Sequence, residues 1–256
     1  MALRTVSGKI LATSLVAAVT VGGTYGFMVQ RRVRLVDRGQ ITRFETIPES
    51  FEKSRSVSDI VNAGNHARVS DSRFIALDIP SQHHGVSDEV LLAKFVKGYF
   101  GGAVIGPERR TLQTLGRNLV HFTTAPVART DVWSLKDLSD TKLPSINTVL
   151  FGVFQTLDLH LATQQPKDGA DRTESYIDFG FGSDKFWFGG AHRFAVVRSR
   201  DEEGKEMVQV HCHSMSCNPS VNKPLRPWWM FEFHKAYADL LFRDGVSEIK
   251  RWMGSV

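Results

Sequence analysis

Apolar positions within residues 87–116 recur at three- and four-residue spacing, which is the period of an amphipathic helix. Ser87 is a good N-cap for a first helix, which ends at the glycine pair 101–102. Pro107 fits the first turn of a second helix, which ends near Gly116. The apolar positions of the first helix are Leu91, Leu92, Phe95, Val96 and Tyr99. The pattern therefore predicts a pair of short helices.

Beyond residue 147 the period shortens to two, which indicates β-strands. In the clearest case, Ile177, Phe179 and Phe181 share one face of a strand. Turns before and after the next strand reverse the chain direction twice, which predicts an antiparallel meander of three strands. The glycine pair 189–190 predicts a β-bulge in the middle strand of this meander. The predicted strands are 72–79, 147–155, 157–162, 175–181, 185–198 and 207–215.

A long helix is predicted near the C-terminus, where residues 228–242 are strongly apolar. Asp244 and Gly245 are expected to end it, and a short basic helix then closes the chain at Trp252. An antiparallel sheet followed by a long helix is an α+β arrangement. We therefore expect a curved antiparallel sheet with the C-terminal helix in its concave face, a helix-grip-like architecture that leaves an apolar cavity between the two.

The N-terminal part carries an uncharged run of twenty residues, Ile10–Val29. As a helix this run would extend about 30 Å, the thickness of a bilayer core, and three arginines follow it closely. We expect an uncleaved single-pass transmembrane helix within residues 1–34, with a cleaved signal peptide or an organellar signal as the alternatives. The basic residues after the run favour a cytosolic location for the rest of the chain. Residues 35–70 are then a tether, and residues 71–256 form a single α+β ligand-cavity domain.

Composition supports a folded protein, and the distribution of charge excludes one class of partner. Apolar residues make up 42% of the chain and charged residues 23%, which is too apolar for a disordered protein. The net charge of +5 arises within residues 1–34, which hold five basic residues and no acid. The rest of the chain carries 27 bases and 27 acids. No basic face for a phosphate backbone is implied, so nucleic acid is not an expected partner.

The sequence lacks the signatures of several cofactor-dependent reactions. It contains no GxGxxG, P-loop, GxSxG, HExxH or CxxC motif, so nucleotide-dependent redox chemistry, phosphoryl transfer and serine-type hydrolysis lack their usual signals. We therefore expect no cofactor. Cys212 and Cys217 are expected to be reduced and buried, with a disulfide between them as the alternative if the chain turns after Met215.

His211 and His213 form the densest cluster of chemically versatile side chains. On a strand both would lie on one face with Gln209, about 7 Å apart at Cα. Two imidazoles so placed can donate to a carbonyl or act as acid and base, whereas a metal site would need a third ligand that no known spacing supplies. We predict catalytic roles for both and no metal. Structural or surface histidines are the alternative.

Asp178 and His192 are the other candidate catalytic residues. The predicted bulge would re-aim His192 towards a site, and Asp178 on the neighbouring strand could pair with His192 or with Arg193. An exposed cross-strand ion pair is the alternative. The aromatic residues predicted to line a substrate cavity, with core packing as the alternative, are Trp187, Trp228, Trp229 and Phe179.

Two stretches resemble known groups of proteins. Residues 87–111, SDEVLLAKFVKGYFGGAVIGPERRT, resemble a segment of uncharacterised fungal membrane-anchored proteins, some of them linked to secondary metabolism. Residues 189–243, from GGAHRFAVV through HCHSMSC to PWWMFEFHKAYADLLFR, resemble a START-like, helix-grip family of unknown function, in which a strand–hairpin–strand unit is also followed by a proline and a long aromatic helix. The resemblance implies a cavity for a hydrophobic small molecule and carries over no catalytic residue.

Together these observations predict a protein whose partners are a membrane and a lipophilic small molecule. The leading hypothesis is a cofactor-independent cyclase or isomerase, including pericyclic, Diels–Alder-type chemistry, acting on a secondary-metabolite intermediate in the apolar cavity. Its donors or acid–base groups would be His211, His213, Asp178 and His192. The alternatives are a non-catalytic lipid or sterol carrier and an assembly factor. Polar side chains inside the cavity would favour the enzyme, and their exposure to solvent would favour the carrier.

Overall fold

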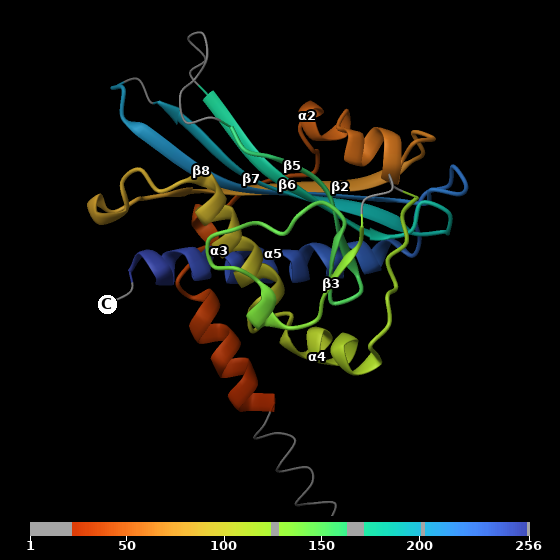
Figure 1. Ribbon diagram of the computed structural model, residues 1–256, viewed down its shortest axis with the longest axis horizontal. Coiled ribbons are helices and arrows are strands. Elements are labelled where there is room, and N and C mark those ends of the chain that lie inside the picture. Colours follow the sequence, from red (N-terminus) through yellow and green to blue (C-terminus); the bar gives the residue numbers. More distant parts are fainter. Residues whose placement is uncertain (1–21, 124–127, 163–171, 201–202, 255–256) are drawn as a thin grey trace, which may run out of the picture.

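The computed structural model describes residues 22–123, 128–162, 172–200 and 203–254 (Figure 1). Residues 10–21 of the predicted membrane anchor lie outside the described residues, whereas residues 22–33 form a helix, the N-terminal helix, that projects from the body. Within these described ranges no single helix has the length and apolarity to cross a membrane. Helices α3 (Asp88–Gly101) and α4 (Gly106–Leu115) have the required length and apolarity only when they are taken together, and they are bent by 76° relative to each other.

Among the described residues, eight strands form one sheet, in the order β1-β2-β8-β7-β6-β5-β4-β3, and neighbours are antiparallel except β3 and β4. The long strands β6, β7 and β8 form the predicted meander, and β2 pairs with β8 along its whole length. The fold is α+β, with a curved, mostly antiparallel sheet and a C-terminal helix, as the sequence predicts. The strands are β1 (Thr42–Phe44), β2 (Arg68–Leu77), β3 (Thr130–Val132), β4 (Thr148–Leu150), β5 (Phe154–His160), β6 (Arg172–Gly182), β7 (Gly189–Arg200) and β8 (Glu206–Cys217).

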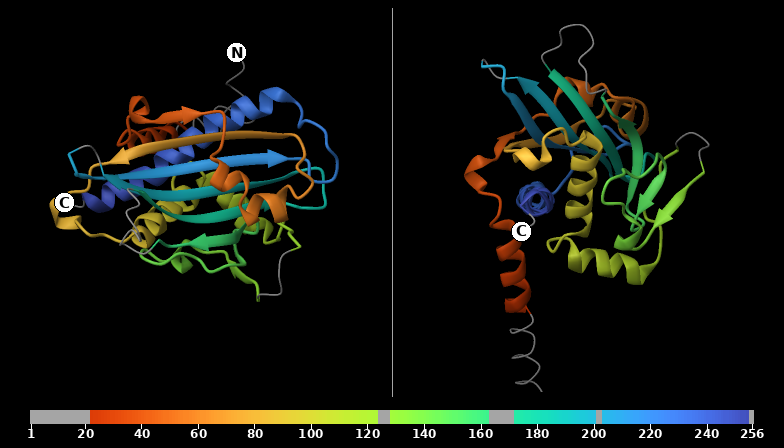
Figure 2. Two further views of the ribbon diagram at one scale, coloured as in Figure 1. Left: turned by 90° about the horizontal axis from the view of Figure 1, so that it is seen from above. Right: turned by 60° about the vertical axis from the view of Figure 1, so that its left-hand side comes forward.

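Helices α3 and α5 (Trp228–Met253) pack on one face of the sheet, which we call the inner face (Figure 2). The Ser87 side chain accepts a hydrogen bond from the Val90 backbone N–H at the start of α3, as predicted. Helix α4 has Pro107 in its first turn and ends at Gly116, whose φ of 59° is left-handed. Aromatic side chains fill much of the inner layer, among them Phe95, Tyr99, Phe100, Phe154, Phe179, Phe181, Phe194 and Phe242.

Helix α5 is continuous from residue 228 to residue 253, so the prediction that it ends at Asp244 and Gly245 is wrong. Gly245 lies where α5 crosses α3. A Cβ added to Gly98 of α3 would approach the Gly245 Cα to 2.8 Å, and one added to Gly245 would approach the Phe95 ring to 2.7 Å. The two glycines therefore allow close packing of the helices, and packing outweighs the helix-ending tendency of Gly245.

Strand β7 carries no bulge, which corrects the prediction at Gly189 and Gly190. Its pairing with β6 and β8 is uninterrupted from Gly189 to Arg200. A Cβ on Gly190 would clash with the Phe181 ring of the neighbouring strand, so this glycine makes room for an aromatic side chain. The register shift in the sheet lies instead in β5, between Thr156 and Asp158.

The opposite, outer face of the sheet is covered over one half. Helix α2 (Glu49–Glu52) and the π-helix η2 (Arg55–Val61) lie on it (Figures 1 and 2). A second core joins this segment to the sheet and includes Ile47, Phe51, Val57, Val61, Ala191, Met215 and Cys217. Residues 35–70, predicted as a tether, thus supply both this cover and the edge strand β1. The short 3-10 helices η1 (Arg38–Gln40), η3 (Ser81–His83) and η4 (Leu135–Asp137) are connections.

The N-terminal helix is fixed to α5 and to the connection between α3 and α4. Arg32 donates to the carboxylates of Asp244 and Glu248 on α5, the latter at 2.8 Å. The Tyr25 hydroxyl donates to the backbone carbonyl of Ala103. These bonds join three segments that are far apart in the sequence.

Candidate functional site

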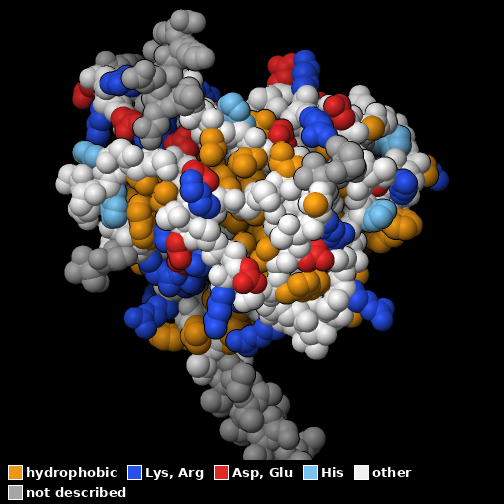
Figure 3. Space-filling view, in the orientation of Figure 1, with side chains coloured by type: hydrophobic (Ala, Val, Ile, Leu, Met, Phe, Trp, Pro, Cys, Tyr) orange, Lys and Arg blue, Asp and Glu red, His pale blue; other side chains and the backbone are white. Residues whose placement is uncertain are grey.

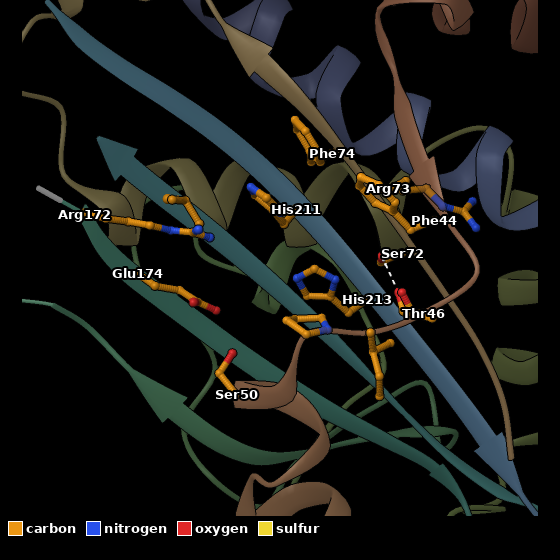
Figure 4. A pocket seen from close by; sticks show the side chains of 13 residues that line it. Phe44, Thr46, Ser50, Ser72, Arg73, Phe74, Arg172, Glu174, His211 and His213 are labelled. Carbon is orange, nitrogen blue, oxygen red and sulfur yellow. Dashed lines mark hydrogen bonds between the residues drawn. The ribbon is translucent and has the colours of Figure 1, made fainter. Parts of the chain in front are cut away.

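A groove on the uncovered half of the outer face is the candidate site (Figure 4). Its volume is about 460 Å³, within the range of roughly 300–1,000 Å³ that small-molecule sites occupy. Strands β1, β2, β6, β7 and β8 and the segment before α2 converge on it. Its principal lining residues are Phe44, Phe74, Arg172, Glu174, His211 and His213.

His211 and His213 lie side by side in the groove, and their predicted placement on one face of a strand is correct (Figure 4). Their ring centroids are 5.6 Å apart. His211 stacks on Phe74 of β2 with 4.8 Å between ring centroids, and its Nε2 lies 3.0 Å from Oε1 of Gln209. Nδ1 of His213 is buried without a hydrogen-bond partner. Both histidines face away from α5, so they lie outside the layer where a cavity was expected.

Burial keeps both imidazoles uncharged. It lowers the pKa of His211 to about 4, and the charge of Arg172 adds to the effect. Burial lowers the pKa of His213 to about 3, with smaller contributions from His211 and Arg193. A neutral imidazole offers one N–H donor and one acceptor nitrogen. Each histidine can therefore donate to a carbonyl oxygen at neutral pH, whereas neither is a strong base.

Asp178 pairs with Arg193 and not with His192. Arg193 donates from Nε to Oδ1 of Asp178 at 2.7 Å and from Nη2 to Oδ2 at 2.8 Å. The guanidinium lies 3.6 Å from the centre of the Tyr176 ring. The ion pair is fully buried, which excludes the exposed cross-strand pair that the sequence left open. Burial raises the pKa of Asp178, and the pairing with Arg193 opposes the rise.

Asp178, Arg193 and His213 follow one another across β6, β7 and β8, in direct register on the outer face. Both oxygens of the Asp178 carboxylate accept from Arg193, and Arg193 also donates from Nη1 to the Ser50 carbonyl at 3.3 Å. The pair therefore supports two residues that line the groove, Ser50 and His213, and its carboxylate is not free for proton transfer.

His192 lies on the inner face, so the structure does not bring the four predicted catalytic residues together. The ring is caged by aromatic side chains, with centroids 4.7 Å from Phe181 and 6.1 Å from Tyr99. Without a bulge, strand alternation alone decides its face, and alternation places it opposite Arg193. Burial lowers the pKa of His192 to about 3.

The predicted substrate-binding aromatics do not line the groove. Trp187 is 70% exposed in the turn between β6 and β7, and Trp229 is 59% exposed on α5. Phe179 is completely buried in the inner core. The side chain of Trp228 lies outside the described residues. Aromatic walls come instead from Phe44 and Phe74, whose rings stack at 6.2 Å.

Sequence reasoning missed Arg172 and Glu174, although a signal for them existed. The polar positions 172, 174, 176 and 178 alternate with the apolar face of β6, and together they form the polar side of that strand. The prediction began this strand at residue 175, three residues short of its observed start. An earlier start would have placed both side chains on the same face of the strand as Asp178.

Cys212 and Cys217 are both free and buried, so no disulfide forms between them. They lie on opposite faces of β8, Cys212 in the inner core and Cys217 in the outer one. Burial raises the pKa of Cys212 to about 12 and that of Cys217 to about 11. Neither thiol can serve as a nucleophile at neutral pH. Within the part of the chain that the structure describes, no three His, Cys, Asp or Glu side chains gather as a set of metal ligands.

Comparison with protein-family models, with curated proteins and with solved structures finds no match for this chain.

Proposed function

We propose that this protein is a cofactor-independent isomerase or cyclase whose substrate, a lipophilic carbonyl compound, binds in the outer groove. The observation that carries the proposal is the pair of neutral imidazoles, His211 and His213, placed side by side between the aromatic walls of a small-molecule-sized groove. A convergence of perturbed titratable groups in a partly apolar hollow is the usual mark of a binding or catalytic site.

Different residues of the groove would have different roles in the reaction. A substrate carbonyl would accept a hydrogen bond from His213, and this bond strengthens as negative charge develops on the oxygen. Gln209 holds the His211 ring in place, and the remaining ring nitrogen of His211 can accept or donate. In an isomerisation, the Glu174 carboxylate takes a proton from the carbon beside the carbonyl and returns it to another carbon. In a cyclisation no proton leaves, and the aromatic walls hold the reactive conformer.

The predicted helix-grip cavity does not accommodate this chemistry, because the histidine pair lies on the other side of the sheet. Packed phenylalanines fill the centre of the layer between the sheet and α5. Two of the four predicted catalytic side chains, His211 and His213, nevertheless line the groove, with exposed fractions of 8% and 6%. Polar side chains inside the groove support the enzyme over a carrier, since a carrier needs almost none.

We also propose that the uncharged run of residues 10–29 anchors the protein in a membrane, from which a lipophilic substrate reaches the groove. The space-filling view shows Lys and Arg side chains gathered at the end of the body that carries the N-terminal helix (Figure 3). Arg31, Arg34 and Arg110 are exposed at the N-terminal helix and on α4. Basic side chains so placed suit anionic lipid headgroups.

The test uses the full-length protein in lipid nanodiscs, incubated with a lipophilic extract of its source. Chromatography with mass spectrometry follows conversion, and native mass spectrometry follows retention. We expect conversion by the wild type, a loss of about 100-fold or more in His213→Phe, and partial activity in His213→Gln, which keeps a donor. His84→Gln changes an exposed loop histidine and serves as the matched control. Retention without conversion would replace the enzyme with a carrier.

A further inference from the structure

A second group of buried polar side chains lies on the inner face, at the edge of the layer between the sheet and α5. Arg73 of β2 and His192 of β7 are each 4% exposed, and His234 of α5 is half-buried. Four of their nitrogen atoms are buried without a hydrogen-bond partner, namely Nε and Nη1 of Arg73, Nδ1 of His192 and Nε2 of His234. The chemistry proposed for the outer groove uses none of them.

These three side chains converge from three elements. The rings of His192 and His234 are nearly parallel, with an interplanar angle of 7° and 6.5 Å between centroids. Arg73 is paired in register with Cys212 of β8, and the inner-face neighbour of Cys212 on β7 is Phe194, two residues from His192. Burial lowers the pKa of both imidazoles, and the positive charge of Arg73 adds to the effect in each.

So many unpaired nitrogens in one place call for a partner from outside the chain. A buried donor without an acceptor costs about 1–3 kcal/mol, and native proteins rarely leave several together. A hollow of about 330 Å³ opens at this edge and is lined by Arg73 and Asp71, together with Arg43 and Lys235. The charges at its rim are already paired, because Arg43 donates to Asp239 at 2.6 Å and Lys235 donates to Glu45 at 3.2 Å.

Charge balance decides which kind of molecule fits. Nη2 of Arg73 donates to the Asp71 carboxylate, so the guanidinium is already neutralised. A carboxylate or phosphate would add a buried charge without a counter-ion, which is strongly unfavourable. A carbonyl oxygen has two lone pairs, brings no proton of its own and adds no charge, so it suits a guanidinium that can only donate.

We propose that this cluster is a second ligand site, in which Arg73 Nε or Nη1 donates to the carbonyl oxygen of an uncharged lipophilic molecule between the sheet and α5, with His192 and His234 beside it. Phe44 and Ala236, which also line the hollow, offer apolar surface for the rest of the molecule. Arg73 borders both this hollow and the outer groove. Strand alternation nevertheless turns its side chain to the inner face, whereas Ser72 and Phe74 on either side of it point to the outer face.

The probe is 2-heptanone labelled with ¹³C at its carbonyl, titrated into the full-length His213→Phe variant in nanodiscs, with protein-free nanodiscs as the blank. This variant lacks the donor proposed for the outer groove, so the bound ketone reports on the inner site. We expect saturable binding and a downfield shift of the bound carbonyl resonance, because a hydrogen bond to a guanidinium withdraws electron density from the carbonyl. Heptanoate is expected to bind at least about tenfold more weakly, since its charge finds no counter-ion.

Two variants remove the donor, Arg73→Met and the charge-balanced pair Asp71→Asn with Arg73→Met, and both should weaken binding about tenfold or more and abolish the shift. Both are made in the His213→Phe background. Arg129→Met, beside β3 at the opposite edge of the sheet, is the matched control and should leave binding unchanged. An absence of saturable binding, or an unchanged shift in the charge-balanced variant, would overturn the proposal and leave ordered water as the partner of these nitrogens. Loss of turnover in His213→Phe bears on the outer groove alone.

Discussion

Asp178 and Arg193 form a bidentate ion pair across β6 and β7, with both N–O distances below 3 Å and neither side chain more than 1% exposed. The pair lies between the second core under α2 and the histidines of the groove. A buried ion pair contributes little net stability over an apolar pair of the same shape, but it is costly to break. The ion pair therefore fixes the relative positions of the side chains around it on the outer face.

Removal of one partner of this pair should destabilise the protein strongly. We expect Arg193→Met to lower the free energy of unfolding by about 3–5 kcal/mol, because Asp178 would remain buried and unpaired. Asp178→Asn combined with Arg193→Met should be less destabilised than the single variant, and urea unfolding measures both. Arg129→Met removes an exposed pair with Asp131 and should change the free energy by about 1 kcal/mol or less. Equal effects of the two arginine changes would contradict this account.

The crossing of α3 and α5 should not tolerate a methyl group. Gly98→Ala would place a Cβ 2.6 Å from the Glu248 Cβ and 2.8 Å from the Gly245 Cα, so we expect a loss of about 1–3 kcal/mol in thermal or urea unfolding. Gly26→Ala in the N-terminal helix is the control, because nothing lies within 4 Å of its added Cβ. That change should be neutral or slightly stabilising. A neutral Gly98→Ala would show that the helices can move apart freely.

Stability should fall with acid in a window set by the buried histidines. Burial lowers the pKa of His192 and His213 to about 3 and that of His211 to about 4, whereas an unfolded histidine has a pKa of about 6.5. Below pH 6.5 the unfolded chain binds protons that the folded chain does not, so this contribution to stability is complete above that pH and is lost as pH falls towards 3. Each histidine contributes up to about 1.4 kcal/mol per pH unit.

Urea unfolding between pH 7.5 and pH 4.5 measures this loss. His192→Phe, which keeps a ring within the aromatic cage, should remove about one proton from the slope. Gly26→Ala, which changes no titratable group, should leave the slope unchanged. An acid slope that is the same in all three proteins would contradict the assignment of neutral buried histidines.

The two thiols should resist modification in the native protein. Cys212 and Cys217 are buried, and burial raises the pKa of each to 11 or above, so the reactive thiolate is scarce at pH 8. We expect a disulfide reagent such as DTNB to titrate both thiols at once in strong denaturant and to react at least about 100-fold more slowly without it. Rapid native labelling of either thiol would show that its side of β8 opens.

Hydrophobic periodicity and helix-capping residues correctly predicted the elements that local sequence determines. The first helix, with its cap at Ser87, and the shared face of His211 and His213 follow from local spacing. Local spacing does not show which part of the sheet is left uncovered. That depends on where α2 and η2, which are distant in sequence from β6, β7 and β8, pack on the sheet. Alternation shows that two side chains are neighbours, and only the packed fold shows what they face.

Two errors have one cause, the interpretation of glycine as a mark of local backbone shape. Gly190 and Gly245 each occupy a place where a neighbouring element approaches too closely for a side chain. The need for such an approach is set by Phe181 and by α3, which the local pattern around each glycine does not reveal. Long-range packing therefore decided the form of β7 and α5.

The bonds of Arg32 and Tyr25 set the orientation of the groove as well as the position of the N-terminal helix. Backbone carbonyls of that segment also accept from α5, since Arg243 donates to the Val33 and Val36 carbonyls. A helix held at several points cannot swivel on the body. If residues 10–29 span a membrane, the groove opening stays at a fixed distance from the lipid surface and in a fixed orientation to it. Substrate would then enter the groove from one direction.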